Sequence, residues 1–313
     1  MIIYAVNIHT GGGKVLLDQI LVTEELGPVS ELFVDSRYDL SLVKNLNIVV
    51  HPVRPSVISR IKAEFALRFS AKKRSQEEIL FFGNLPPIFR LKNKSNLYLH
   101  SRFLITTTPI PTDSFWVLLR TFVERLWLSW FIKNINSVWV QTKSMKELAS
   151  TQFPRTEIFV KPIYPLMPEV RPQSKLYDFI AVSSFSKHKN FKTLLAALGT
   201  LDGKLNRFVK FVIVLDSKNI PSELYEKKYR NLEVSFKNSV NRTELANLYS
   251  AAKFNVVTSS YESFCLPLYE AAFYGIPSIA LNTDFAQDSG AVRILYENNS
   301  ADELADALLR AVG

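Results

Sequence analysis

Residues 261–277 read YESFCLPLYEAAFYGIP, and they combine carboxylate side chains with the predicted start of a helix. The mostly apolar residues 254–257 just before them predict a strand. Pro267 fixes φ near the helical value and lacks the N–H that a first helical turn leaves unpaired. A helix is therefore predicted to begin near residue 266, to continue through residue 274 and to end at the Gly-Ile-Pro sequence.

Two glutamates flank the start of this predicted helix. Glu262 falls in the loop before it, and Glu270 falls about one turn into it. Between them, the backbone N–H groups of Phe264, Cys265 and Leu266 form the helix start, where the dipole favours an anion. The stretch therefore predicts a small anion-binding site beside two acids. The alternative is structural, because acids near a helix start also occur by chance and complement the dipole.

The rest of the carboxyl-terminal half alternates strands with helices. A capping box, Ser300-Ala301-Asp302-Glu303, opens the last predicted helix. This alternation predicts a doubly wound parallel sheet. The predicted strands are residues 178–183, 208–215, 232–236 and 278–281 besides 254–257, and the other predicted helices are 191–198 and 242–252.

A basic loop follows the first strand of this half and contains Ser184, Lys187, Lys189 and Asn190. Carboxyl ends of neighbouring parallel strands meet at one edge of a sheet, so we expect this loop near the Glu262 loop. Lys187 and Lys189 would then neutralise a diphosphate that backbone N–H groups hold from the other side. The alternative is an ordinary solvated basic loop.

The amino-terminal half begins with a predicted buried strand, residues 2–6, followed by a glycine triplet and a predicted helix over residues 14–26. A glycine turn between strand and helix lets backbone approach a phosphate or sugar, which makes Gly12 and Gly13 candidate donor-binding residues. The triplet matches neither the dinucleotide fingerprint nor a P-loop. A purely structural tight turn is the alternative.

Further strands of this half are predicted at residues 29–34, 48–50, 79–82, 97–99 and 137–140. Polar residues follow two of these strands: Gly83-Asn84 follows residues 79–82, and His100 follows residues 97–99. An open α/β sheet binds its ligands at such strand ends. His100 is therefore a candidate catalytic residue, with a structural histidine as the alternative.

Length and composition predict two globular domains in the 313 residues. Residues 161–172, KPIYPLMPEVRP, contain four prolines and are predicted to link a domain over 1–160 to one over 173–313. The single cysteine excludes an internal disulfide framework and suits a reducing compartment. The first residues do not resemble a signal peptide, and no run of 18 residues lacks charge, so no spanning helix is expected.

The net charge of +9 is concentrated in the first half. Residues 1–172 hold 22 Lys and Arg against 14 Asp and Glu, whereas residues 173–313 hold 16 against 15. The first half is therefore expected to face something anionic. Nucleic acid is not expected, because no zinc spacing, recognition helix or arginine-rich tail is present.

Anionic lipid suits the charge better, and two segments are candidates for contacting it. Residues 60–74, RIKAEFALRFSAKKR, hold six basic residues and one acid, and we expect them to touch an anionic membrane or a phosphorylated lipid acceptor. Residues 115–132 are rich in aromatic side chains. For these we favour a core helix packed on the sheet, with a membrane-interface helix as the alternative.

The order of strand, small-residue loop, Glu-Ser-Phe-Cys-Leu-Pro, Glu-Ala-Ala and Tyr-Gly-Ile-Pro resembles the paired-glutamate motif of retaining glycosyltransferases of the GT-B fold, family four. The resemblance implies two facing Rossmann-like domains, with the acceptor domain first and the donor domain second. It implies that Glu270 binds the nucleotide ribose, that Glu262 lies near the transferred sugar, and that Lys189 is the lysine of a basic pair. Ser184 stands where that pair has an arginine, which is a departure from the family pattern.

The resemblance further implies a hexosyltransferase-like enzyme that uses a nucleotide-diphosphate sugar. Because the sequence contains no Asp-x-Asp motif and no His/Cys cluster, no metal requirement is expected. The acceptor would be a glycan or lipid-linked oligosaccharide of cell-surface polysaccharide synthesis, such as lipopolysaccharide. A cytoplasmic location, peripheral on the inner face of the membrane, is expected. Family members often continue with a helix that returns to the first domain, so a compact or shortened member is expected. The alternatives are a nucleotide-sugar epimerase of the same fold and a non-catalytic subunit of a membrane-associated assembly.

Overall fold

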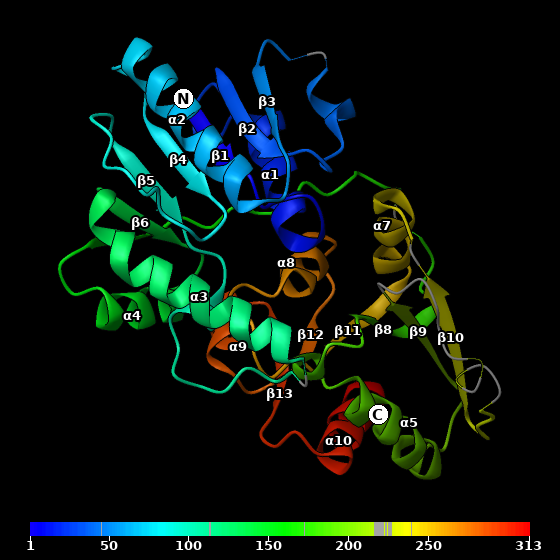
Figure 1. The fold of residues 1–313 in the computed structure, drawn as a ribbon. Helices are drawn as coiled ribbons and strands as arrows, with labels where there is room; N and C mark the ends of the chain where they lie inside the picture. Colours follow the sequence, from blue (N-terminus) through cyan, green and yellow to red (C-terminus); the bar gives the residue numbers. More distant parts are fainter. Residues whose placement is uncertain are drawn as a thin grey trace. The chain divides into compact units, whose positions relative to one another are not determined.

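The computed structural model describes residues 1–44, 46–112, 114–171, 173–215, 222, 224, 227–238 and 240–313. The chain divides into two compact units, Met1–Leu166 and Met167–Gly313. In Figure 1 each unit is a sheet with helices packed on it. The division lies inside the predicted linker, whose described residues 161–171 form neither helix nor strand.

The first unit contains a parallel sheet of seven strands in the order β3-β2-β1-β4-β5-β6-β7. The strands are β1 Ile2–Ala5, β2 Glu31–Asp35, β3 Val49–Val53, β4 Ile79–Phe82, β5 Ser95–Tyr98, β6 Ser137–Val140 and β7 Glu157–Val160. The helices are α1 Gly11–Thr23, α2 Val57–Lys73, α3 Phe115–Phe131 and α4 Lys143–Gln152, and the short turns are η1 Leu40–Val43, η2 Arg102–Leu104 and η3 Ile132–Asn134.

The central strands of this sheet are buried on both faces, which explains why their sequences are continuous apolar runs. The predictions at residues 79–82 and 137–140 match β4 and β6 at both ends. The edge strand β7 was not predicted, because its apolar run is only three residues long, 158–160, and three of its four residues are exposed. One core cluster joins this sheet to residues of α2, α3 and α4, among them Leu67, Leu128 and Met145.

The glycine triplet differs from its prediction. Helix α1 begins at Gly11, so the glycines form its first turn and do not precede it. Gly11 has a φ of +66°, a left-handed value that glycine adopts without strain. The amino-terminal turn of α1 therefore carries no side chains, and a ligand could approach its backbone closely.

The second unit contains a parallel sheet of six strands in the order β10-β9-β8-β11-β12-β13. The strands are β8 Tyr177–Ser183, β9 Val209–Leu215, β10 Leu232–Asn238, β11 Ala252–Val257, β12 Ser278–Leu281 and β13 Val292–Tyr296. The described helices are α5 Phe191–Lys204, α7 Arg242–Ser250, α8 Leu266–Phe273, α9 Asp284–Ser289 and α10 Ala301–Val312, and a short turn, η4 Lys187–Lys189, precedes α5.

Two elements of the second unit, α9 and β13, were not predicted. Both are short, and β13 alternates exposed with less exposed residues. The predicted capping box forms only in part. Ser300 Oγ accepts the backbone N–H of Glu303 at 3.3 Å, but the Glu303 carboxylate accepts N–H groups from Glu297 and Asn298 instead. A complete capping box opens α7, between Asn241 and Glu244.

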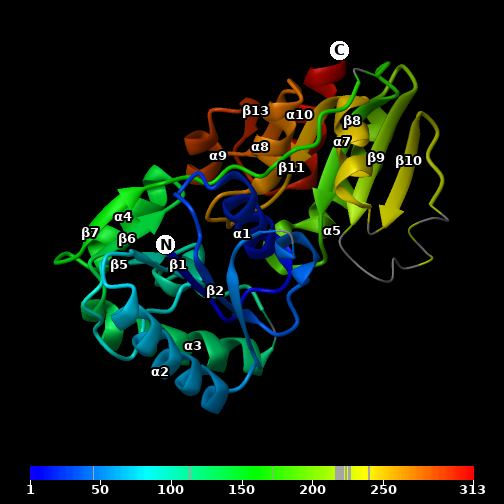
Figure 2. The ribbon, with the colours of Figure 1, turned by 90° about the horizontal axis from the view of Figure 1, so that it is seen from above.

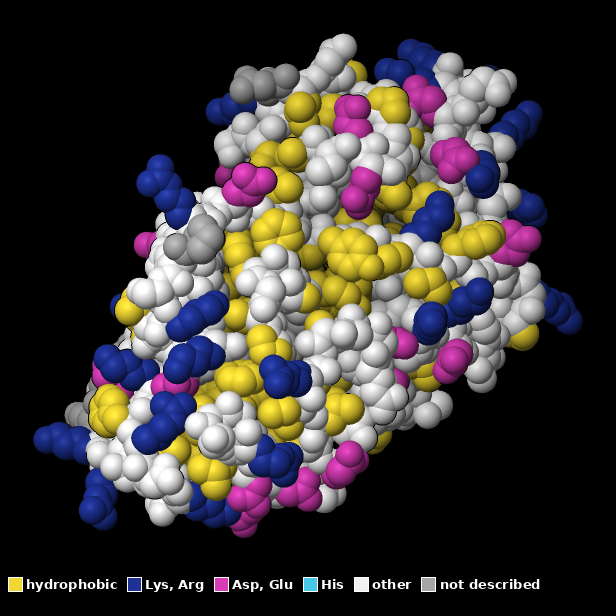
Figure 3. Space-filling model, turned by 180° about the vertical axis from the view of Figure 1, so that it is seen from behind, with side chains coloured by type: hydrophobic (Ala, Val, Ile, Leu, Met, Phe, Trp, Pro, Cys, Tyr) yellow, Lys and Arg dark blue, Asp and Glu magenta, His cyan; other side chains and the backbone are white. Residues whose placement is uncertain are grey.

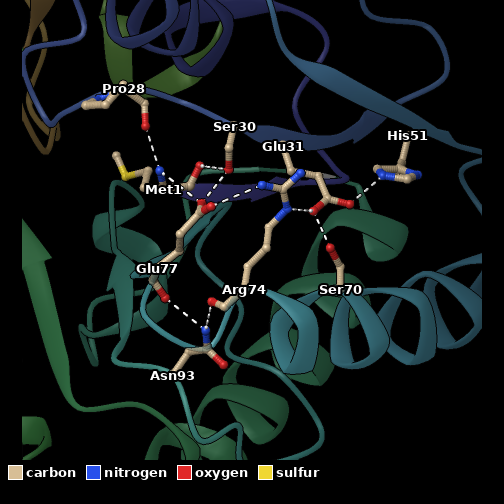
Figure 4. A network of polar contacts seen from close by, with 9 residues as sticks. All are labelled: Met1, Pro28, Ser30, Glu31, His51, Ser70, Arg74, Glu77 and Asn93. Atoms are coloured by element: carbon tan, nitrogen blue, oxygen red, sulfur yellow. Dashed lines mark hydrogen bonds and ion pairs between the residues drawn. The ribbon is translucent and has the colours of Figure 1, made fainter.

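A network of polar side chains fastens the end of α2 to the amino-terminal edge of the first sheet (Figure 4). Glu31 on β2 pairs with His51, Nε2 to Oε1 at 2.6 Å, and with Arg74, Nε to Oε2 at 3.4 Å, and it accepts a hydrogen bond from Ser70. Beside it, Glu77 pairs with the amino group of Met1 at 3.2 Å. This network lies at the sheet edge opposite the carboxyl ends of the strands, so its role is to hold α2 in place.

Helix α3 corrects a prediction. Residues 115–132 were expected to form a core helix, but within α3 only Thr121 and Leu128 are buried. The side chains of Trp116 and Trp130 are 75% and 65% exposed. Because α3 is apolar around most of its circumference, one packed face cannot cover all of its apolar side chains, and the remainder face outward.

Candidate functional site

The sheet topology places one candidate site at the carboxyl ends of β8 and β11. These strands are neighbours, and the chain continues from β8 toward β9 on one side and from β11 toward β12 on the other. In open α/β sheets, ligands bind in the crevice at such a switch point because the two following loops diverge there. The loops concerned are residues 184–190 and 258–266, both singled out from the sequence.

Several hydrogen bonds join these two loops. Asn190 has a φ of +50°, and its side-chain amide donates to the carbonyl of Thr258 at 2.8 Å. The Thr258 hydroxyl donates to the carbonyl of Lys189 at 2.6 Å, and the N–H of Ser260 donates to the carbonyl of His188 at 2.8 Å. The predicted proximity of the two loops is therefore confirmed.

Lys189 and Glu262 form an ion pair at this site. The Lys189 Nζ lies 2.5 Å from Glu262 Oε1, and His188 Nε2 lies 3.7 Å from the same oxygen. Burial alone would lower the pKa of Lys189, but the Glu262 carboxylate outweighs it and holds that pKa above its usual value. Burial lowers the pKa of His188, although Glu262 opposes the shift. The pair is thus a protonated lysine against a carboxylate.

The other residues of the basic loop do not all gather at this pair. Ser184 is half-buried, and its hydroxyl donates to the Ser186 hydroxyl at 3.2 Å. Lys187 is exposed at the start of η4. Lys189 is therefore the lysine of the loop that the structure brings to Glu262.

Helix α8 starts beside the ion pair. Cys265, its N-cap residue, is buried and left-handed at φ +57°, and Phe264 before it is buried with its ring stacked on Tyr269 at a centroid distance of 4.0 Å. Burial raises the pKa of the Cys265 thiol, so the thiol is neutral. Leu266 begins the helix and Pro267 follows it. N–H groups of a first helical turn have no acceptor within their helix, so this turn can receive an anion.

Glu270 lies on the inward side of α8 and is only 3% exposed. Its Oε1 accepts from the Arg242 guanidinium at 2.7 Å, and its Oε2 accepts from the Tyr249 hydroxyl at 3.1 Å. Both partners lie on α7, and sequence reasoning missed them. One signal was present, because an arginine at the first position of a helix opposes the dipole and implies a specific acidic partner.

The candidate site residues of the first unit lie close together at the switch point of the first sheet. Its switch point lies between β1 and β4, and a Cβ on Gly13 would stand 3.5 Å from His100 Nε2. The Asn84 amide nitrogen lies 3.1 Å from His100 Nε2, and Asn84 Oδ1 accepts the backbone N–H of His100 at 2.8 Å. Burial lowers the pKa of His100 to about 4, so the imidazole is neutral at physiological pH. Gly12 is exposed beside this cluster on the first turn of α1.

Two kinds of feature are absent from the described part of the chain. No group of three or more His, Cys, Asp or Glu side chains that could hold a metal ion occurs among these residues. None of the helices formed by them is long and apolar enough to cross a membrane.

The sequence of the second unit matches a known protein family. Residues 166–312, which include all of the second unit except Gly313, match the family model described as Glycosyl transferases group 1. No curated protein matches the chain by sequence.

Solved structures match both units at low sequence identity. Sucrose-phosphate synthase from Thermosynechococcus elongatus matches with a TM-score of 0.72 at 16% identity, over 100% of this chain and 90% of that chain. Anabaena Alr3699/HepE in complex with UDP-glucose matches with a TM-score of 0.70 at 14% identity, over 99% and 89%. The lipopolysaccharide outer core galactosyltransferase WaaB matches with a TM-score of 0.64 at 14% identity, over 99% and 89%.

The chain spans only half the length of another match, TarM, which has a TM-score of 0.59 at 17% identity over 78% of this chain and 50% of that chain. These likenesses show the fold. The chain has the GT-B fold of two Rossmann-like domains, as predicted, and its second domain matches the group 1 glycosyltransferase model.

Proposed function

We propose that the chain is a retaining glycosyltransferase of the paired-glutamate type, family four, with a nucleotide-diphosphate sugar as donor. The observation that carries the proposal is the Lys189–Glu262 pair at the switch point of the second unit, beside the start of α8. A cation, a helix amino terminus and a carboxylate together suit a diphosphate that is attached to a sugar. The match of residues 166–312 to the glycosyltransferase model supports this reading.

Lys189 changes partner in this proposal. Without donor its charge is balanced by Glu262 at 2.5 Å. A bound diphosphate carries more charge than one carboxylate, so it competes for the ammonium group. Lys189 then stabilises the leaving nucleoside diphosphate, and Glu262 stays beside the sugar, where positive charge develops. Ser184 adds no charge where the family pattern has an arginine, so the α8 N–H groups and Lys187 supply the remaining contacts.

Sugar transfer with retention requires a balanced exchange at the anomeric carbon. The bond from C1 to the diphosphate oxygen breaks, and the acceptor oxygen bonds C1 on the same face. The acceptor hydroxyl proton leaves with the diphosphate, so no redox partner is needed. Glu270, held in place by Arg242 and Tyr249, is proposed to accept hydroxyl groups of the nucleotide ribose.

The acceptor in this proposal is a glycan or lipid-linked oligosaccharide of cell-surface polysaccharide synthesis. It binds the first unit, in which Gly12 and Gly13 are the proposed sugar-binding turn and His100 is the proposed catalytic residue. Similarity to WaaB, a lipopolysaccharide outer core galactosyltransferase, supports this class of acceptor. Because Lys189 and the α8 dipole supply the charge that balances the leaving group, we propose that turnover needs no metal ion. Unchanged turnover in EDTA is the corresponding expectation.

Nucleotide binding tests the proposal directly. The melting temperature of the full chain is measured with UDP, GDP, ADP, CDP and TDP at millimolar concentration. At least one should stabilise the protein, because a ligand that binds only the folded state raises its stability. Lys189→Gln should remove most of that shift. Lys204→Gln is the matched control, because Lys204 forms a similar pair with Asp306, at 2.7 Å, at the other end of α5.

Two outcomes would contradict the proposal. If no nucleotide raises the melting temperature, the chain is better explained as a non-catalytic subunit that retains the fold. If Lys189→Gln and Lys204→Gln show the same shift as the parent protein, the diphosphate does not bind at the Lys189–Glu262 pair.

A further inference from the structure

The outward sides of α2 and α3 form one apolar surface in the first unit, which we call the α2–α3 face. Its exposed large side chains include Ile58, Phe65 and Phe69 on α2 and Trp116, Phe122 and Trp130 on α3. We propose that the α2–α3 face docks on an anionic lipid bilayer, with its aromatic side chains in the interfacial layer.

The spacing of these side chains places them on one side of each helix. On α2, Ile58, Phe65 and Phe69 follow intervals of seven and four residues, so they lie along one stripe. On α3, Trp116 and Trp130 are fourteen residues apart, which is close to four full turns. Each helix therefore has a buried side and a continuous apolar outer side.

The two helices lie against each other, as Figure 2 shows. The Arg60 guanidinium on α2 stands 4.9 Å from the centre of the Trp127 ring on α3, and the Trp127 indole N–H donates to the carbonyl of Pro86 at 2.8 Å. The other end of α2 is held by the Glu31 and Arg74 pair of Figure 4. Since all these residues belong to the first unit, the face does not depend on the second unit.

The segment of the chain that carries the α2–α3 face is strongly basic. Residues 54–133 contain fourteen Lys and Arg against five Asp and Glu, a net charge of +9 that equals the formal net charge of the whole chain. The remaining residues are therefore neutral overall. Exposed cations beside the apolar stripe of α2 include Lys62, Arg68, Lys72 and Lys73, and the Lys73 Nζ lies 4.4 Å from the centre of the Phe69 ring.

The acidic residues of α2 and α3 do not offset this charge. Glu64 is buried and accepts the N–H of Ile88 at 2.7 Å, and Glu124 is partly covered, with its Oε1 3.6 Å from Arg120. The view from behind in Figure 3 differs, because hydrophobic side chains there are surrounded by basic and acidic side chains together. On α2 and α3 the exposed charges beside the apolar side chains are mainly cationic.

A bilayer fits this combination better than a protein partner or a second copy of the chain. Lysine is depleted in the cores of protein interfaces, whereas here lysines and arginine border the apolar stripe directly. Two copies of a cationic face would repel each other. Tryptophan prefers the membrane interface, and Trp116 and Trp130 mark the two ends of α3. The proposal uses no residue of the donor site, so it stands or fails separately from the proposed function.

Vesicle flotation of the full chain tests the proposal. Vesicles of phosphatidylcholine alone are compared with vesicles that contain about one third phosphatidylglycerol, at low and high salt. We expect binding to the anionic vesicles only, weakened by salt. Lys72→Gln with Lys73→Gln should weaken it by about 25-fold, since each cation near an anionic surface contributes about fivefold. Lys237→Gln, an exposed lysine of β10, is the control.

Aromatic variants test the apolar part. Trp116→Ser with Trp130→Ser should weaken binding about tenfold or more, because both indoles are then lost from the interface. Phe208→Ser, which changes an exposed aromatic of the second unit, should bind like the parent protein. Three of the four tryptophans lie on α3, so brominated lipid should quench the fluorescence of the parent protein.

Specific results would overturn the proposal. They are equal binding to neutral and anionic vesicles, no binding to either, or unchanged binding by both double variants. A parent protein that is dimeric in solution, and that the tryptophan substitutions make monomeric, would show that a second copy covers the face instead. The nucleotide-induced melting shift of each variant, measured in parallel, reports whether the second unit is intact.

Discussion

The buried carboxylate of Glu270 should depend on Arg242. Glu270 is 3% exposed, and Arg242 is the charged group that pairs with it in the described structure, Nη1 to Oε1 at 2.7 Å. Substitution Arg242→Met keeps the length of the side chain and removes its charge. Breaking a fully buried pair costs about 3–5 kcal/mol, because the remaining charge is uncompensated.

The expected loss is smaller here. The Arg242 side chain is about one-third exposed, so solvent already screens part of the pair, and Tyr249 still donates to Glu270 at 3.1 Å. We expect Arg242→Met to lower the free energy of unfolding by about 2 kcal/mol. Urea denaturation measures this loss, and the nucleotide-induced melting shift should fall with it, because Glu270 loses its fixed orientation.

Arg207→Met is a closely matched control. The Arg207 Nη2 lies 3.1 Å from Asp178 Oδ1, and the two side chains have nearly the same exposures as Arg242 and Glu270. In this variant Asp178 still pairs with Lys253, Nζ to Oδ1 at 2.9 Å, and its Oδ2 still accepts the backbone N–H of Lys210 at 3.0 Å. The expected loss in the free energy of unfolding is therefore only about 0–1 kcal/mol. Nucleotide binding should not change in this variant.

A double substitution isolates the interaction. Glu270→Gln has no charge to compensate, so adding it to Arg242→Met should recover part of the lost stability, with a coupling of about 1–2 kcal/mol. The reasoning is refuted if Arg242→Met costs no more than Arg207→Met and leaves the nucleotide shift unchanged.

Two predictions concern the first unit. Gly83→Ala should destabilise the protein by about 1–2 kcal/mol, because its Cβ would stand 2.0 Å from Asn7 Oδ1 and displace the amide that donates to the Gly83 carbonyl. In urea denaturation Gly203→Ala, in open space within α5, should be neutral or stabilising by up to about 1 kcal/mol, and equal losses would contradict the argument. The folded pKa of His100 is lowered to about 4, so the unfolded state alone takes up its proton between pH 6.5 and about 4. Stability conferred by the neutral His100 is therefore present above pH 6.5 and is lost as the pH falls toward 4, by on the order of 3 kcal/mol. In pH-dependent unfolding, His100→Gln should not show this loss, and parallel curves for the two proteins would contradict the prediction.

The sheets were predictable because buried parallel strands have a sequence signal that needs no tertiary context. Strands β4, β6 and β12 were predicted with both ends correct, and each is wholly buried. Strands β7 and β13 were missed because their apolar stretches are short: β7 has only residues 158–160, and Arg293 interrupts β13. Burial on both faces therefore helped to predict strand ends, although β3 and β10, which are mostly exposed or half-buried, were also predicted in part.

The candidate site was predictable where it depends on strand ends. Lys189 and Glu262 follow neighbouring strands, so topology alone brings their loops together. The partners of Glu270 were not predictable in the same way. Arg242 and Tyr249 lie on α7, and which turn of α7 faces α8 depends on packing that no local pattern specifies.

Helix α3 shows the same limit for surfaces. A segment such as FWVLLRTFVERLWLSWF predicts a helix from its composition, but its apolar residues occupy most of the circumference and do not mark an inner side. Neighbours decide the orientation, and here α3 buries Leu128 in the core and leaves Trp116 and Trp130 outside. Exposed aromatic surface of this kind is rare on monomeric proteins unless something binds it. The basic residues of α2 alone suggested a membrane from the sequence, but only their adjacency to the exposed tryptophans of α3 gives that idea a surface with an apolar part.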